Sequence, residues 1–203
     1  MNRIKLLFRK YGFIGIGILI YNIIRSKSLN HKIRLIRFPI EIRNKHLIQF
    51  GDSLTIGRYC RIECESSSLS EKRKKLIFGN NIQINDFVHI SCSDSIILGD
   101  NVLIASKVFI SDSNHGNYSG INQDHPQSIP KDRDLNTSPV LIGDNVWIGE
   151  NVCILKGVKI GQGSIIAANT VVTKSVPANT IIGGVPGRIL KSYDIDQGKW
   201  IKV

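Results

Sequence analysis

Hydrophobic and polar positions recur with a period of six residues along most of the chain. From Ile142 the sequence divides into six consecutive blocks that each start with an aliphatic residue: IGDNVW, IGENVC, ILKGVK, IGQGSI, IAANTV and VTKSVP. Similar blocks run from Leu98 and from Phe78, three in each run, and two more run from Phe50. An amphipathic helix would instead need a period of about 3.6 residues. The pattern therefore predicts a parallel β-helix over about residues 48–190.

Each position of a block has a physical role in such a fold. The leading Ile, Leu or Val and the fifth residue, often Val, Ser or Thr, point inward. Gly, Asn and Asp occupy the corners, because sharp turns need the backbone conformations that these residues tolerate. Three blocks then make one three-sided coil. Since a single coil cannot bury its inner face, coils must stack, and the two ends of the stack need caps.

Two segments interrupt the repeat. Residues 65–75 are rich in serine and then in charged residues, which predicts a solvated loop. Residues 113–139 form a longer excursion that begins with SNHGNYSG and later carries KDRD. Long excursions from a regular scaffold often build the wall of a binding site. We therefore expect the functional residues of the chain to lie near the second interruption.

The C-terminal part of the repeat resembles a known family. The tract from Asn145 to Lys191, NVWIGENVCILKGVKIGQGSIIAANTVVTKSVPANTIIGGVPGRILK, is similar to the signature of the hexapeptide-repeat acyltransferases, in the branch of galactoside, maltose and polysaccharide O-acetyltransferases. The resemblance extends over about residues 48–191. It implies that the β-helix is left-handed, so the expected fold class is all-β, a left-handed parallel β-helix with an N-terminal helical arm and an extruded active-site loop. It also implies a homotrimer with active sites between subunits, and acetyl-CoA as co-substrate with no metal required.

His115 stands where the repeat gives way to the long loop. Transfer of an acetyl group from a thioester to a hydroxyl needs a base, and a neutral imidazole suits that role. The residues alone do not separate His115 from His89 and His125. The resemblance favours His115, because the NHG triplet matches the position of the family's catalytic histidine. Ser113 and Cys153, the candidate nucleophiles for an acyl-enzyme, have no base at a recognisable spacing, which favours direct transfer.

The resemblance also implies substrate contacts. It assigns Asn85 to the acceptor sugar, although this residue could equally be a corner asparagine. Trp147, at an outward-facing position, would border the active site or form a trimer contact. The family's acidic acceptor contact lies near Ser93, whereas this chain has Asp94. The residues assigned to acetyl-CoA are Gly149, Ala168, Thr173, Lys174, Arg188 and Lys191.

Charge separates the N-terminal arm from the rest of the chain. Residues 1–45 hold eleven Lys and Arg and one acidic residue, Glu41, whereas the remainder holds sixteen basic and fifteen acidic residues. The near-neutral remainder argues against nucleic acid as a partner. The apolar run 11–24 is flanked by basic residues and is shorter than the roughly 20 residues that span a bilayer. We expect a helix that lies at a membrane surface or packs on the β-helix or a neighbouring subunit.

These observations give three regions and one leading function. We expect an arm over residues 1–45, a β-helix domain over 46–191 with the loop 113–139, and a tail over 192–203. The four cysteines are interpreted as reduced, mostly buried thiols. The leading hypothesis is a cytoplasmic O-acetyltransferase, peripheral at the inner membrane face, that modifies a sugar hydroxyl of a surface polysaccharide or a lipid-linked precursor. The alternatives are N-acetylation of a nucleotide-linked amino sugar or xenobiotic, and a non-catalytic trimeric module.

Overall fold

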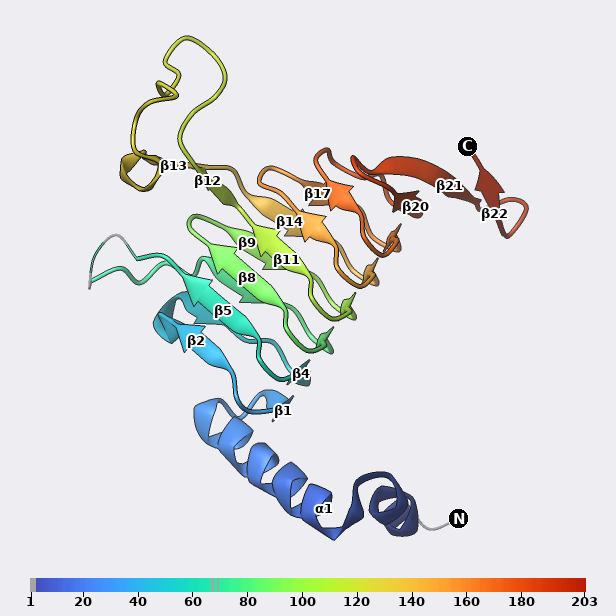
Figure 1. Ribbon diagram of the computed structural model, residues 1–203. Coiled ribbons are helices and arrows are strands. Elements are labelled where there is room, and N and C mark those ends of the chain that lie inside the picture. Colours follow the sequence, from blue (N-terminus) through green and yellow to red (C-terminus); the bar gives the residue numbers. More distant parts are fainter. Residues whose placement is uncertain (1–2, 67, 69) are drawn as a thin grey trace.

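The computed structural model describes residues 3–66, 68 and 70–203, and their main part is the predicted parallel β-helix (Figure 1). Successive strands of the chain lie on three sheets in turn, so that each round of strands forms one coil. Sheet A consists of β1 (Ile33–Ile36), β4 (Leu54–Ile56), β7 (Gln83–Ile84), β10 (Leu103–Ile104), β15 (Trp147–Ile148), β18 (Ile165–Ile166), β20 (Thr180–Gly183), β21 (Arg188–Asp194) and β22 (Lys199–Lys202). Sheet B consists of β2 (Glu41–Arg43), β5 (Arg61–Cys64), β8 (His89–Cys92), β11 (Phe109–Ser111), β16 (Cys153–Ile154) and β19 (Val171–Val172). Sheet C consists of β3 (Ile48–Gln49), β6 (Leu76–Phe78), β9 (Ile96–Leu98), β14 (Val140–Ile142) and β17 (Lys159–Ile160).

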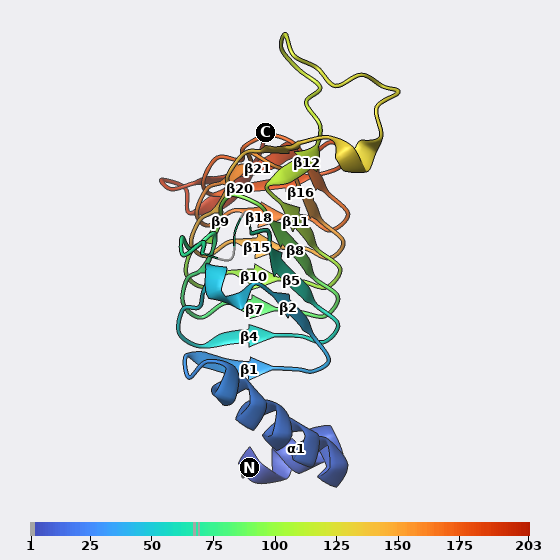
Figure 2. The ribbon, with the colours of Figure 1, turned by 90° about the vertical axis from the view of Figure 1, so that its left-hand side faces the viewer.

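The sheets meet at three edges, named here by the sheets that they join: the A–B edge, the B–C edge and the C–A edge. Figure 2 shows the parallel strands of sheet A stacked one above another. Neighbouring coils stay in register, as when Ile104 of β10 pairs with Ile84 on one side and Ile148 on the other. The long loop leaves the stack at the B–C edge. Its two stems, β12 (Ser113–His115) and β13 (Leu135–Thr137), form an antiparallel pair, and a short 3-10 helix, η2 (Pro130–Asp132), lies between them.

The interior follows the hexapeptide pattern. The leading residue of every block is buried, and so is the fifth residue of most blocks, as at Ile148 and Val152. The exceptions are the fifth residues Asp94 and Asn114, which are partly exposed where the chain departs from the repeat. Each fully buried aliphatic side chain contributes about 1.5–3 kcal/mol relative to its exposed state. The fourth residue of most blocks has a positive φ, including Asn145 (58°) and Gly157 (76°), which explains the asparagines and glycines at the corners. The predicted roles of these positions are therefore confirmed.

The coils begin earlier in the chain than the sequence indicated. Strands β1 and β2 belong to the first coil, so this coil takes up residues 33–43 of the region that was expected to be the arm. Here Arg34 and Leu35 separate the buried Ile33 from Ile36, and the corners lack the usual Gly-Asn pairs, so the hexapeptide pattern is hidden. A 3-10 helix, η1 (Lys45–Leu47), leads into β3. At the other end, β21 and β22 form an antiparallel hairpin on sheet A.

The N-terminal helix α1 (Arg3–Leu29) means that all-β describes the coils but not the whole chain. It is broken at Gly12, whose φ of 65° and ψ of 178° are not helical. Its second segment lies across the open end of the first coil (Figure 1). There Asn22 and Ser26 are buried, and the Ser26 hydroxyl accepts the N–H of Ile36 at 2.6 Å while it donates to the carbonyl of Asn22. The helix therefore caps that end of the stack.

Candidate active site

A cavity of about 350 Å³ lies on the outer face of sheet B, beside the B–C edge. His115 from β12 and Leu135 from β13 line it on the side of the long loop. Strands β5 and β8 contribute Glu63 and His89 to the same cavity, together with serines from β8 and β11. The cavity thus joins the base of the loop to the polar outer face of sheet B. It brings an exposed imidazole next to hydroxyl, carboxylate and arginine groups.

Contacts within the long loop fix the backbone at His115. His115 pairs with Leu135 across the two stems of the loop. The carbonyl oxygen of His115 accepts a hydrogen bond from the Tyr118 hydroxyl at 2.5 Å, and Arg133 donates to that hydroxyl at 2.7 Å. Arg133 also donates to the carbonyl oxygen and the hydroxyl of Ser128 at 2.6 and 2.8 Å. Arg133 therefore links Ser128 in the loop to Tyr118 and, through the Tyr118 hydroxyl, to His115 at the base of the loop.

The residue before the loop, Asp112, is a positioning residue that the sequence analysis missed. Its carboxylate is fully buried and accepts the backbone N–H groups of Ser93, Asp94 and Ser95 at 2.7, 2.8 and 2.6 Å. These bonds fix the start of the loop to the corner between β8 and β9. A signal was present in the repeat, because Asp144 occupies the same third position of its block and likewise accepts an N–H from the preceding coil.

An ionic cluster forms the wall of the cavity opposite the loop. Glu63 accepts hydrogen bonds from Arg61 at 2.7 and 2.9 Å, from Arg43 at 3.1 Å, and lies 3.0 Å from Nε2 of His89. Burial alone would raise the pKa of Glu63, but hydrogen bonds from His89 and Arg61 outweigh it and hold that pKa below its ordinary value. The Glu63 carboxylate therefore stays ionised and holds the cluster together.

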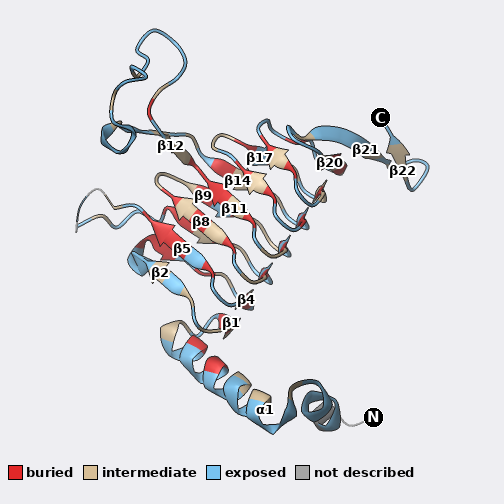
Figure 3. Ribbon diagram, in the orientation of Figure 1, coloured by how far each residue is buried: buried red, intermediate tan, exposed pale blue. Residues whose placement is uncertain are grey.

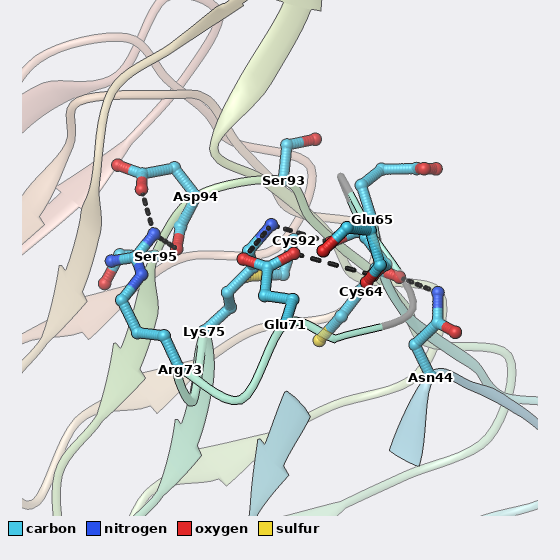
Figure 4. Close-up of polar contacts among 12 residues, drawn as sticks. Asn44, Cys64, Glu65, Glu71, Arg73, Lys75, Cys92, Ser93, Asp94 and Ser95 are labelled. Atoms are coloured by element: carbon cyan, nitrogen blue, oxygen red, sulfur yellow. Dashed lines mark hydrogen bonds and ion pairs between the residues drawn. The ribbon is translucent and has the colours of Figure 1, made fainter. Parts of the chain in front are cut away.

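Charged residues that precede β6, namely Glu71, Arg73 and Lys75, lie beside the corner between β8 and β9 (Figure 4). Arg73 forms an ion pair with Asp94 at 2.5 Å and also donates to the Asp94 carbonyl. The buried Lys75 lies 3.0 Å from Glu71 and donates to the carbonyl of Glu65 at 2.8 Å. Asp94, the acidic residue nearest the position expected for an acceptor contact, is therefore paired with an arginine of the same chain.

The other candidates for the base and for a nucleophile make contacts within the protein. Nδ1 of His125 accepts the N–H of Gln127 at 3.2 Å within the long loop. The Ser113 hydroxyl lies 2.9 Å from that of Ser93. The cysteines are free thiols, and three of them are buried. Burial raises the pKa of the Cys60 thiol to about 11, so this thiol stays protonated at neutral pH. The interpretation of the cysteines as reduced thiols fits these contacts.

A second cavity of about 320 Å³ lies near the C-terminal end of the stack. Thr173 and Lys174, at the B–C edge after β19, line it together with Arg188 from β21. Lys191, further along β21, is exposed and pairs with Ile181 of β20. Of the residues assigned to acetyl-CoA, the structure thus brings Thr173, Lys174 and Arg188 into one groove. Two cations in this groove would suit the phosphates of that substrate.

Gly149 and Ala168 lie elsewhere, on adjacent coils at the A–B edge. A Cβ added at Gly149 would lie only 2.6 Å from the backbone nitrogen of Ala168, so the two backbones approach as closely as glycine allows. Trp147, on the outer face of sheet A, is half exposed and pairs with Leu103 and Ile165. These residues therefore form a surface that is separate from the groove.

Asn85 follows β7 at the A–B edge, and its side-chain oxygen accepts a hydrogen bond from Gln83 at 3.1 Å. It lines a cavity that shares no residue with the cavity at His115. Asn85 and His115 of this chain lie beside opposite edges of sheet B. Within residues 3–66, 68 and 70–203, no three His, Cys, Asp or Glu side chains gather as a metal-binding group.

Comparison with known sequences finds one relative over nearly the whole chain and others over parts of it. Residues 139–174 match the family model described as bacterial transferase hexapeptide (six repeats). WbbJ of Escherichia coli K12, whose name describes it provisionally as a lipopolysaccharide biosynthesis O-acetyl transferase, is 40% identical over 97% of both chains. The galactoside O-acetyltransferase of the same organism is 36% identical over 57% of this chain and 53% of its own length.

Solved structures share the fold. A hexapeptide-repeat acetyltransferase of Vibrio cholerae, solved in complex with acetyl-CoA, has a TM-score of 0.57 and 26% identity over 95% of this chain and 90% of its own. An N-acyltransferase of Bacillus cereus, solved with dTDP and 3-hydroxybutyryl-CoA, has a TM-score of 0.66 and 22% identity over 82% of each chain. The second likeness extends to the fold alone.

Proposed function

Because this chain belongs to the hexapeptide-repeat acetyltransferases, we propose that it transfers the acetyl group of acetyl-CoA to a sugar hydroxyl of a surface polysaccharide or of its precursor. Membership makes the chain an acyltransferase with acetyl-CoA as co-substrate. The observation that carries the choice of acceptor is the 40% identity to WbbJ over nearly the whole chain. In this proposal the coils wind left-handed and the protein is a cytoplasmic homotrimer, as the family resemblance implies.

His115 is the proposed general base. The neutral imidazole takes the proton of the acceptor hydroxyl while the oxygen attacks the thioester carbonyl. The tetrahedral intermediate then collapses as its C–S bond breaks, and the departing CoA sulfur takes the proton from the imidazolium. Two features support the assignment: His115 faces the cavity on sheet B, and the Arg133–Tyr118 contacts hold its backbone.

The separation of the site residues supports a site that is shared between subunits. Asn85 lies beside the A–B edge and His115 beside the B–C edge, so the two can meet on one acceptor only if different subunits contribute them. The half-exposed Trp147 on sheet A provides an apolar surface for such a junction. We therefore place each active site at a contact between two copies, with Asn85 and Trp147 on one subunit and His115 on the other.

Acetyl-CoA is proposed to occupy the surface between the groove at Arg188 and the A–B edge. Neither Lys174 nor Arg188 has a carboxylate partner in the part of the chain that the structure describes, so both cations remain available to phosphate oxygens. At the A–B edge Ala168 is exposed and open to the pantetheine arm, whereas Gly149 is buried and lets the backbone of Ala168 approach closely. Thr173 and Lys191 complete the set of proposed contacts.

Replacing Arg188 by Gln is expected to raise the KM for acetyl-CoA by about ten-fold, since a charge-assisted hydrogen bond to phosphate is worth about 1.5–3 kcal/mol. Steady-state rates at varied acetyl-CoA concentration check this. Lys199→Gln, an exposed lysine of β22, is the matched control. An Arg188→Gln enzyme with the KM of the control would contradict the proposed groove.

The acceptor class is tested by comparing substrates in one assay. Acetyl-CoA turnover is measured with a lipid-linked glycan, with the same glycan free, and with nucleotide-linked amino sugars. The proposal expects the glycan hydroxyls to be acetylated more efficiently than the amines. Preferential acetylation of an amine would replace O-acetyl by N-acetyl transfer. Absence of turnover together with absence of acetyl-CoA binding would leave only a non-catalytic module.

The outward face of α1 supports a peripheral membrane contact. The polar Asn22 and Ser26 are buried, whereas Phe13 and Ile14 are 84% and 83% exposed. Figure 3 shows that most of α1 is exposed and that its few buried positions lie in its second segment. Tyr21 and Ile24 are exposed as well, and basic residues stand at both ends of the helix. By length and composition α1 could cross a membrane. Because its second segment packs on the first coil, we place it in the plane of an anionic lipid surface instead.

Replacing Ile14 by Asp is expected to weaken binding to phosphatidylglycerol vesicles by about ten-fold or more, because burial of one large aliphatic side chain contributes about 1.5–3 kcal/mol. Co-sedimentation measures the partitioning. Ile121→Asp makes the same change at a fully exposed isoleucine of the long loop and should leave binding as it is. Equal partitioning of both variants would indicate that another protein surface covers α1.

A further inference from the structure

A basic pocket lies between α1 and sheet A, on the side of the A–B edge. It has a volume of about 330 Å³, within the range of small-ligand sites. Lys10 comes from the first segment of α1, Arg34 from β1, and Arg37 from the residue after β1. Asn85 and Asp86, which follow β7, form the opposite side. Three cations from separate elements therefore face one hollow.

These cations lack an anionic partner. None of Lys10, Arg34 and Arg37 forms an ion pair in the part of the chain that the structure describes. The single carboxylate of the pocket, Asp86, accepts the N–H of Arg58 at 2.7 Å. With three cations and one carboxylate on its walls, the pocket carries a net positive charge, which favours an anionic ligand.

The pKa of Tyr11, next to the pocket, reflects the positive charge of these side chains. A hydrogen bond with Arg37 lowers the pKa of Tyr11, and the charge of Lys10 acts in the same direction. Arginine presents several N–H donors in a planar fork that matches phosphate oxygens, and a lysine adds a mobile positive charge. A phosphate or diphosphate therefore fits the pocket better than a single carboxylate, which one arginine would already satisfy.

The pocket lies next to the proposed acceptor contact, so an anion bound there could belong to the acceptor. Asn85, the proposed acceptor contact, lines the pocket from the side of sheet A, and α1 lines it from the side of the proposed membrane contact. A molecule that reaches from α1 toward the acetylation site would pass over Lys10 and Arg34. The pocket is thus placed to hold the charged link between a sugar and its carrier.

We propose that the pocket formed by Lys10, Arg34, Arg37 and Asn85 binds the phosphate or diphosphate of a phosphorylated sugar acceptor. The inference rests on the proposed O-acetyltransferase function, which it deepens by naming the acceptor's anionic group. Sugars linked to a lipid diphosphate and sugars linked to a nucleoside diphosphate share this chemistry. The test therefore includes both carriers.

Arg34→Gln is the test variant, because Arg34 is exposed and its loss leaves the core intact. Lys32→Gln, an exposed lysine outside the pocket, is the control for the change in net charge. Acetylation is measured with one sugar in three forms: a short-chain polyprenyl diphosphate, a nucleoside diphosphate and a neutral methyl glycoside. Inorganic pyrophosphate binding is measured by calorimetry on each variant. Arg34→Lys, which keeps the charge, tests rescue.

Arg34→Gln is expected to raise the KM for a diphosphate-bearing acceptor about ten-fold, with a much smaller change for the methyl glycoside. It should weaken pyrophosphate binding by a similar factor, and Arg34→Lys should restore most of it. The diphosphate form with the higher kcat/KM identifies the carrier. If Arg34→Gln shifts all acceptors equally, or matches Lys32→Gln in both measurements, the inference is wrong.

The calorimetry separates this inference from the proposed function. Pyrophosphate that binds at Arg34 in a protein without acetyl transfer would support the pocket and overturn the O-acetyltransferase proposal. Acetyl transfer with the same KM pattern in wild type and Arg34→Gln, and with no pyrophosphate binding, would overturn the pocket and keep the function.

Discussion

Replacing His115 by Ala is expected to lower kcat for acetyl transfer by about 10²- to 10⁴-fold, the usual contribution of a positioned general base. Binding of acetyl-CoA should persist, because the groove at Thr173, Lys174 and Arg188 shares no residue with the cavity at His115. Initial rates with saturating acetyl-CoA and acceptor measure the loss, and calorimetric titration with CoA measures binding. A large fall in kcat with intact CoA binding would locate the defect in the chemical step.

His125→Ala is the matched control for this experiment. His125 lies in the same loop, but its Nδ1 accepts a backbone N–H and it does not line the cavity on sheet B. Its loss should change kcat far less than the loss of His115. If the two variants lose activity equally, the effect comes from the loop and not from the imidazole at its base. If His115→Ala retains full activity, the proposed mechanism is wrong.

Replacing Asp112 by Ala is expected to lower the free energy of unfolding by about 3–5 kcal/mol. The change removes a buried carboxylate and leaves the N–H groups of Ser93, Asp94 and Ser95 without their acceptor. Each hydrogen bond to a charged group is worth about 1.5–3 kcal/mol, and the losses overlap because one carboxylate makes all of them. The corner that holds the start of the long loop should loosen, so kcat should fall as well.

Asp144→Ala provides the comparison. Asp144 holds the same position in its block, but it is exposed and accepts one backbone N–H, that of Asp100. Its loss should cost under about 1 kcal/mol. Thermal unfolding of both variants, at one protein concentration because the proposed trimer makes Tm depend on concentration, gives the difference. Similar Tm values for the two variants would mean that Asp112 contributes no more than an ordinary corner aspartate.

The coils were predictable because their signal is local. The residue types within each block of six indicate which positions face inward and which one forms the corner. In IGENVC, Ile148 and Val152 face inward and Asn151 forms the corner. Because successive coils repeat the same arrangement, their stacking follows from the pattern of a single coil. His115 stands where the repeat stops, which made it a candidate, but the residues alone did not separate it from His89 and His125, and only the family resemblance favoured it.

Other features depend on contacts between coils, which the spacing of residues does not encode. The first coil is hidden because its corners at residues 37–40 and 44–47 lack the hexapeptide pattern. Asp112 is expected to contribute strongly to stability because the preceding coil places three backbone N–H groups within hydrogen-bond distance of its carboxylate. The basic pocket exists because the angle of α1 brings Lys10 next to residues far along the chain. The repeat establishes which side chains face inward. Which outward side chains meet depends on the lengths of the insertions and on the orientation of the capping helix, because the distances between those side chains are set by packing in three dimensions.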